Sequence, residues 1–216
     1  MTNLLHIDAS PRGERSHSRK LTKEFVETWQ KFYHLDTLSY RDVGRNPIPH
    51  VTEAWIAAAF TPENKRSPEM KQTLRLSDEL IDELLAADIY VMGVPMYNWS
   101  VSSSFKAYID NIVIINRTWA YIPDENPEFP YKPLVSNKKM FVIASRGDGG
   151  FASGERNHQR DFQIPLIRET FGMLGINNIT FITVENDEYG GQKLAESLAT
   201  ARSQIKELIS ASRLSE

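Results

Sequence analysis

Two aromatic residues and an asparagine stand just after an apolar segment near the middle of the chain. The segment runs from Ile89 to Val94 and continues as Pro95-Met96-Tyr97-Asn98-Trp99. The rings of Tyr97 and Trp99 could flank a flat heterocycle, and the Asn98 amide carries a donor and acceptors for its polar edge. The alternative is a loop whose aromatic side chains only pack against neighbouring helices.

Short polar side chains near the N-terminus form a second group. Its members are Ser10, Ser16, His17 and Ser18, with Arg12 and Gly13 between them. They lie between a predicted strand and a predicted helix, an arrangement that holds phosphate because loop amides converge and the helix dipole favours negative charge. The nucleoside triphosphate and dinucleotide fingerprints are both absent. The alternative is a capped helix after an ordinary loop.

A third group lies in the second half of the chain, after the apolar segment 140–144. Its members are Ser145, Arg146, Gly147, Asp148, Gly149 and Gly150. The glycines allow the backbone to approach a planar ligand closely, or to turn its amides toward it. The sequence thus offers three loops with chemistry suited to binding.

Hydrophobic periodicity and breaker residues predict the elements that position these loops. Strands are predicted at 4–9, 34–40, 88–94, 140–144 and 179–184, and helices at 19–32, 52–60, 68–87, 100–116, 162–174 and 192–212. Pro95 is expected to end the third strand, because proline has no N–H to donate to the ladder. The segment 117–133, with four prolines and four aromatic residues, is predicted to be a long covering loop.

Strands that alternate with helices predict an α/β fold with a doubly wound, five-stranded parallel sheet, in a single domain over residues 1–216. In the flavodoxin-like strand order 2-1-3-4-5, the first, third and fourth strands are neighbours. The three loops follow these strands and would line one pocket at their carboxyl ends, where open α/β sheets bind ligands. A phosphorylated flat heterocycle fits such a pocket better than any other common ligand.

Composition excludes several classes of function. The 216 residues carry a formal net charge of −3, which gives no general attraction to nucleic acid or to an anionic membrane. Cysteine is absent, so thiol catalysis and thiolate metal sites are excluded, and no metal site is predicted. The sequence shows neither a signal peptide nor an apolar stretch of membrane-spanning length, so a cytoplasmic protein is expected.

Over essentially its whole length the chain resembles the FMN-dependent NADH azoreductase family, also described as NADH:quinone oxidoreductases. The most specific piece is Pro95-Met96-Tyr97-Asn98-Trp99, which is similar to the family's P-M-Y-N-F/W flavin loop. The polar group near the N-terminus resembles the family's phosphate cradle, and Ser145-Arg146-Gly147 resembles its S-R-G-G turn. The resemblance implies a flavodoxin-like homodimer with flavin pockets near the subunit interface, which reduces quinones and azo compounds with NADH or NADPH.

The resemblance also assigns roles to residues. It implies that FMN carries out the redox chemistry, so no catalytic side chain is expected. The residues expected to hold FMN are Ser10, Ser16, His17, Ser18, Pro95, Met96, Tyr97, Asn98, Trp99, Ser145, Arg146, Gly147 and Asp148. Tyr121 and Phe162 are expected to sandwich the substrate over the flavin. If reductant and acceptor share that slot, they must take turns, which predicts ping-pong kinetics.

Two departures from the family pattern concern the flavin and the subunit interface. Asp148 stands where the family has a glycine; it could lie near the flavin's pyrimidine edge, but we expect it to point to solvent. The segment 101–105 and the run Ile114-Ile115-Asn116 also differ from the family. The surplus apolar surface at 112–115 either sinks into the sheet or meets another subunit, and we expect a dimer.

Two other functions compete with this interpretation. A hydrolase of the acyl-carrier-protein phosphodiesterase type would need an activated nucleophile or a metal site. The sequence has neither a G-x-S-x-G nor an H-E-x-x-H motif, and its five histidines are scattered. A non-enzymatic flavodoxin-like electron carrier would tend to be strongly acidic, whereas 25 basic residues here nearly balance 28 acidic ones.

Overall fold

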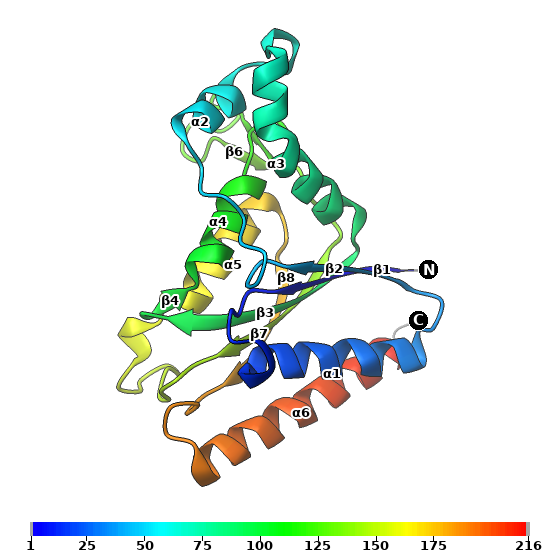
Figure 1. Ribbon diagram of the computed structural model, residues 1–216, viewed down its shortest axis with the longest axis vertical. Coiled ribbons are helices and arrows are strands. Elements are labelled where there is room, and N and C mark those ends of the chain that lie inside the picture. Colours follow the sequence, from blue (N-terminus) through cyan, green and yellow to red (C-terminus); the bar gives the residue numbers. More distant parts are fainter. Residues whose placement is uncertain (1, 215–216) are drawn as a thin grey trace.

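Five parallel strands form the central sheet of the computed structural model, which describes residues 2–214 (Figure 1). They are β1 (Asn3–Asp8), β2 (Thr37–Asp42), β3 (Ile89–Tyr97), β7 (Lys139–Ser145) and β8 (Asn178–Val184). Their order is β2-β1-β3-β7-β8, so the predicted flavodoxin-like order is confirmed. β3 and β7 lie inside the sheet and are almost wholly buried, which explains their continuous apolar sequences.

Helices cover both faces of the sheet (Figure 1). α1 (His17–Phe32) and α6 (Gly191–Leu214) lie on one face, while α3 (Pro68–Ala86), α4 (Ser103–Ile112) and α5 (Gln163–Leu174) lie on the other, with the short α2 (Glu53–Phe60) against α3. Single turns of 3₁₀ helix occur at Gly13–Arg15, Glu63–Lys65 and His158–Arg160. Within residues 2–214, no helix combines the length and the apolar character that crossing a bilayer requires.

Local sequence signals explain where the helices begin and end. Four helices start at hydroxyl side chains that accept a backbone N–H of the first turn, each worth about 1 kcal/mol. These caps are Ser16, Thr52, Ser67 and Ser102. α5 stops at Gly175, whose φ is 107°. A Cβ there would lie 2.0 Å from the Val135 carbonyl oxygen, so no larger residue fits.

The third strand does not end at Pro95, so that prediction is wrong. Pro95 opposite Ser145 is the last parallel pair between β3 and β7, but the strand continues to Tyr97. Met96 and Tyr97 pair in antiparallel fashion with β4 (Ser100–Val101). The missing N–H of one proline therefore ends the parallel ladder without ending the strand, because a hairpin partner takes over.

The predicted helix 100–116 is shorter in the structure, and part of its apolar surface is internal. Residues 100 and 101 form β4, and α4 begins after its cap Ser102. Ile112 and Ile114 are buried in the chain's own core, whereas Ile115 is half-buried. The apolar residues thus sink largely into their own sheet, and the surplus surface offered as a reason for a dimer is much smaller than expected.

The segment 117–133 is not a structureless loop, which corrects the prediction. β5 (Trp119–Tyr121) and β6 (Tyr131–Pro133) form an antiparallel hairpin of their own. The Tyr131 ring lies 5.5 Å from that of Trp119 and 5.4 Å from that of Phe129, measured between centroids. Strands of three residues are too short to show a two-residue period among four prolines, so aromatic packing rather than periodicity marks this hairpin.

Candidate functional site

Four loops meet at the carboxyl edge of the sheet and enclose a cavity of about 220 Å³. They follow β1, β3, β7 and β8, whose carboxyl ends are adjacent in the sheet. The cavity is lined by Ser10, Arg12, Ser16, His17, Pro95, Met96, Tyr97, Asn98, Ser145, Arg146, Gly147, Asp187 and Glu188. The structure therefore unites the three loops singled out in the sequence and adds a fourth.

The loop after β1 carries polar side chains to the N-terminus of α1. Ser16 caps the helix by accepting the Arg19 N–H at 3.3 Å, and Ser10 and His17 line the cavity beside it. Unpaired N–H groups of the first turn and the positive end of the helix dipole favour an anion here. Ser18 is fully buried and does not line the cavity; its Oγ lies 3.1 Å from the Ser16 Oγ and braces it instead.

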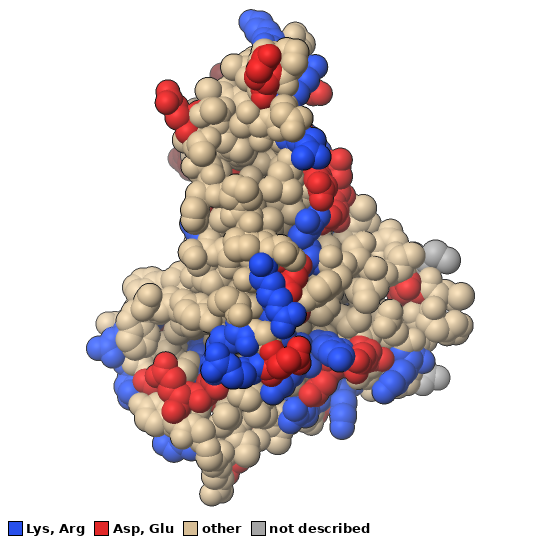
Figure 2. Space-filling model, in the orientation of Figure 1, with Lys and Arg blue, Asp and Glu red and all other residues tan. Residues whose placement is uncertain are grey.

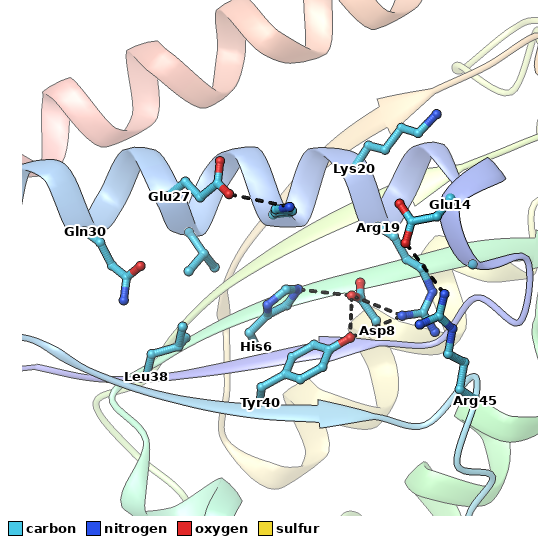
Figure 3. Close-up of a pocket in the computed structure, with 13 residues that line it drawn as sticks. His6, Asp8, Glu14, Arg19, Lys20, Glu27, Gln30, Leu38, Tyr40 and Arg45 are labelled. Carbon is cyan, nitrogen blue, oxygen red and sulfur yellow. Dashed lines mark hydrogen bonds and ion pairs between the residues drawn. The ribbon is translucent and has the colours of Figure 1, made fainter.

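Arg19 anchors this loop from within the molecule, and Figure 3 shows its side chain beside Asp8. Its Nε donates to the Ser10 carbonyl oxygen at 2.7 Å. Its guanidinium pairs with Asp42 and lies 3.5 Å from Asp8 Oδ2. Arg19 is only 9% exposed, so a charged group inside the protein fixes the backbone of the polar loop to the carboxyl ends of β1 and β2.

Two groups that contact Arg19, Asp42 and Tyr40, have pKa values shifted away from neutral pH. Burial opposes the charge of Asp42, but hydrogen bonds from Arg19 and from the Arg45 N–H outweigh it and hold the pKa of Asp42 below its ordinary value. Burial, together with the nearby carboxylates of Asp8 and Asp42, raises the pKa of Tyr40 to about 12. The Tyr40 hydroxyl therefore stays protonated and hydrogen-bonds Asp8 Oδ2 at 3.1 Å.

The turn between β3 and β4 has an unusual backbone. Asn98 and Trp99 have φ values of 47° and 69°, the left-handed region that a two-residue hairpin turn requires. Asparagine tolerates this conformation, but a tryptophan there stores about 1 kcal/mol or more of strain, and strain of this kind clusters at functional sites. The strained backbone presents Tyr97 and Asn98 to the cavity.

Trp99 does not share that cavity with Tyr97. Its ring is 40% exposed and lies 6.2 Å from the Phe151 ring, with the Arg160 guanidinium 5.5 Å from its centroid. Tyr97 and Asn98 also line a larger groove of about 760 Å³ on the side of α4. The predicted pair of rings around one heterocycle is therefore not brought together within one chain.

Arg146 lines the cavity, but its side chain is engaged inside the protein. The guanidinium pairs with Asp161 at 2.6 Å and with Glu185 at 3.4 Å, and Nε donates to Gln163 Oε1 at 3.0 Å. The side chain is 2% exposed. These contacts tie the loop after β7 to the loop after β8 and to the start of α5. The Arg146 main chain is engaged as well, because its N–H donates to the Val184 carbonyl oxygen at 2.7 Å and its carbonyl oxygen accepts the Asp187 N–H at 3.2 Å.

The Asp148 side chain bonds to other residues of its own loop. Its carboxylate accepts the Gly149 N–H at 2.7 Å and the Asn157 amide at 3.0 Å, and it pairs with Arg156. Burial opposes its charge, but these bonds hold the pKa of Asp148 below its ordinary value. Asp148 is neither at the cavity wall nor turned to solvent; it closes the glycine-rich loop.

Tyr121 and Phe162 lie far apart within one chain. Phe162 precedes α5, and its N–H bonds the Trp99 carbonyl oxygen at 3.0 Å. Tyr121 belongs to the β5–β6 hairpin, which packs near the other end of α5, where Val135 N–H donates to the Leu174 carbonyl oxygen. A helix of 12 residues spans about 18 Å. Both residues are more than half exposed, and the Tyr121 ring lies 6.4 Å from the Tyr131 ring of its own hairpin, measured between centroids.

Three residues of the cavity wall were not among those that the sequence analysis expected to hold FMN. They are Arg12, Asp187 and Glu188. The Asp187 carboxylate forms an ion pair with Arg12 and lies 3.1 Å from His17 Nε2. A signal for the two acidic residues was available, because they follow the fifth strand and every parallel strand of the sheet ends at the same edge.

The chain is similar in sequence to named proteins and matches a family with the same fold. The family described as "Flavodoxin-like fold" matches residues 2–209. The FMN-dependent NADH:quinone oxidoreductase of Nostoc punctiforme is 49% identical over 209 residues, which cover 97% of this chain and 98% of that protein. The FMN-dependent NAD(P)H:quinone oxidoreductase 1 of Pseudomonas aeruginosa is 39% identical over 206 residues, covering 95% and 97%.

A solved structure adds to this comparison. The FMN-dependent NADH-azoreductase of Bacillus anthracis, crystallised in complex with FMN, superposes with a TM-score of 0.84 and 21% identity, over 99% of this chain and all of that one. Identity at this level speaks for the fold alone. The sequence relatives go further, because their identity extends over nearly the full length of both proteins. The chain therefore belongs to the flavodoxin-like family and, within it, to the FMN-dependent NADH:quinone oxidoreductases.

Proposed function

We propose that this protein binds FMN and uses it to transfer hydride equivalents from NADH or NADPH to quinones and azo compounds. The observation that carries the proposal is one cavity in which a capped helix N-terminus meets a strained aromatic and amide turn. The names of the quinone oxidoreductase relatives and of the azoreductase with the same fold support this activity.

The residues of the cavity fit FMN chemically. The N-terminus of α1, with the Ser10 and Ser16 hydroxyls and the His17 ring, offers donors for a single phosphate group. The Asn98 amide, which has both a donor and an acceptor, suits the polar edge of a flat ring, and Gly147 lies at the wall of the same cavity. When bound, FMN supplies the ring that accepts and releases hydride.

The protein itself would bind FMN, orient its ring and shield it from water. Ser16 and His17 would bind the phosphate, with Ser18 behind Ser16 as a brace. Met96, Tyr97 and Asn98 would line the ring, and Asp148 would keep the glycine-rich loop closed. No side chain in this arrangement has to act as acid or base.

Flavin identity gives the direct test of the proposal. The purified protein is expected to be yellow and to release FMN on heating, identified by chromatography against standards, because the site has one phosphate cradle. Recovery of FAD, or no flavin binding after reconstitution with FMN, would contradict the assignment. Rapid multiple turnover with NADH and a soluble quinone would separate an enzyme from a pure electron carrier.

Kinetics test whether the two substrates take turns. Reductant and acceptor are both flat, and we expect them to use the same open side of the site. Initial rates at several quinone concentrations should then give parallel double-reciprocal lines, and NADH alone should bleach the flavin absorbance under anaerobic conditions. Intersecting lines, with slow bleaching unless quinone is added, would mean that both substrates bind together.

We further propose a homodimer in which Phe162 of one subunit and Tyr121 of the other form the substrate slot. The exposure of both rings and their separation within one chain support this arrangement. Phe162→Ala and Tyr121→Ala proteins should each have low activity. Subunit exchange between equal amounts should restore about a quarter of the wild-type rate, because half of the dimers are mixed and each has one intact slot. No restoration in demonstrably mixed dimers would contradict the shared slot.

We propose that the partners are small molecules, because the candidate site is a cavity of about 220 Å³. Figure 2 shows acidic and basic side chains intermingled on this face, without the extended basic patch that nucleic acid or an anionic membrane would need. Within the described part of the chain, no group of three or more His, Asp or Glu side chains is placed to hold a metal ion. We propose a cytoplasmic location, where NADH and NADPH are available as reductants.

A further inference from the structure

The cavity contains a carboxylate that already binds Arg12 and His17, two side chains that would also bind a phosphate. Asp187 Oδ1 lies 3.1 Å from His17 Nε2, and its Oδ2 pairs with Arg12. Its side chain is 15% exposed. His17 stands in the first turn of α1, and Arg12 in the loop that leads to it, so both side chains lie near the positive end of the helix dipole.

The main chain holds Asp187 in this position. Its N–H donates to the Arg146 carbonyl oxygen at 3.2 Å, and the next N–H, of Glu188, donates to the Gly147 carbonyl oxygen at 2.9 Å. These bonds fasten the loop after β8 to the loop after β7. The carboxylate is therefore a fixed part of the cavity wall, and a ligand anion has to share Arg12 and His17 with it.

We propose that Asp187 competes with the cofactor's phosphate for Arg12 and His17, and so sets how strongly the protein prefers a phosphorylated flavin over an unphosphorylated one. This inference rests on the proposed FMN site. A phosphomonoester carries −1.5 to −2 charges at neutral pH. Beside Asp187 it meets a like charge, and it must share Arg12 and His17, which the carboxylate already binds.

The opposite role for Asp187, helping the phosphate to bind, makes a different prediction. If Asp187 served to orient Arg12 and His17 for the phosphate, its loss would weaken FMN binding, because the two side chains would lose their fixed positions. Competition predicts stronger binding instead. The direction of the change therefore separates the two roles.

The experiment compares flavin-free wild-type protein with Asp187→Asn, which keeps the shape of the side chain and removes its charge. FMN and riboflavin binding are followed by quenching of flavin fluorescence, and inorganic phosphate binding by calorimetry. We expect the substitution to tighten FMN binding about tenfold and to tighten phosphate binding as well. Riboflavin binding should change by less than about twofold, because it has no phosphate.

Glu24→Gln is the matched control, since Glu24 lies on α1 like His17 but pairs with Arg202 outside the cavity. It should leave the preference for FMN over riboflavin unchanged. In an Arg12→Gln background, the gain from Asp187→Asn should shrink if the two residues act through one another. An FMN or phosphate affinity that falls or stays constant in Asp187→Asn would overturn the inference.

The phosphate measurement distinguishes a failure of the proposed FMN binding from a failure of the competition by Asp187. If wild-type protein binds phosphate but no FMN, the proposed function fails, while the effect of Asp187→Asn on phosphate still decides the competition. If neither ligand binds wild type or variant, the anion site itself is wrong, and the inference falls with it.

Discussion

Replacing Arg19 with methionine is expected to lower the free energy of unfolding by about 3–5 kcal/mol. Methionine keeps much of the side-chain volume but leaves the carboxylates of Asp8 and Asp42, 5% and 10% exposed, without their guanidinium partner. The Ser10 carbonyl oxygen loses a donor as well. Urea denaturation of flavin-free protein, followed by tryptophan fluorescence, measures the change.

Lys23→Met is the control for this substitution because it lies on the same helix. Its ion pair with Glu27 spans 3.8 Å between two largely exposed side chains, so its loss should change stability by less than about 1 kcal/mol. FMN affinity should fall in Arg19→Met and remain unchanged in Lys23→Met. A loss below 1 kcal/mol in Arg19→Met would show that the cluster relaxes around the missing charge.

Gly44→Ala should damage both stability and cofactor binding. A Cβ at Gly44 would lie 2.4 Å from the Ser10 carbonyl oxygen and 2.5 Å from its carbonyl carbon. These are backbone atoms that no rotamer change can move, so the loop that carries the phosphate-binding groups must shift. We expect a loss of about 1–3 kcal/mol in unfolding free energy and of at least about tenfold in FMN affinity.

Gly172→Ala provides the matched comparison. Gly172 lies inside α5, and a Cβ there would meet Asn177 Oδ1 at 3.4 Å, an ordinary contact. Alanine should raise stability by about 0.5–1 kcal/mol there, because glycine weakens helices. Thermal unfolding and FMN titration of both variants give the measurement. Equal effects of the two substitutions would show that the loop around Ser10 tolerates displacement.

The sheet could be predicted from the sequence because its inner strands are buried on both faces. Such strands appear as continuous apolar runs, as between Ile89 and Val94, and the polar loops that follow them must share one edge. Three of the four loops around the cavity could therefore be named in advance. The N-cap of α1 at Ser16 follows from similarly local chemistry.

The remaining parts of the site depend on contacts between distant residues. Nothing in the spacing of α1 shows that Arg19 is buried, because its burial follows from carboxylates on β1 and β2. The pairing of Asp187 with Arg12 joins two loops from opposite ends of the chain. Periodicity and local propensity carry no information on such pairs, so neither Asp187 nor its partner Arg12 was predicted, whereas His17, at the capped start of α1, was.

The arrangement of the loops has a consequence for how the protein matures. Ser10 and Asp187, on two sides of one cavity, come from the first and the last parallel strand in chain order. A chain emerging from the ribosome completes this wall only after β8 has been synthesised and has added to β7, a late and non-local step. FMN can therefore bind stably only after the sheet is complete. A protein that retains flavin has completed its fold, and free FMN stabilises only chains that are folded in this way.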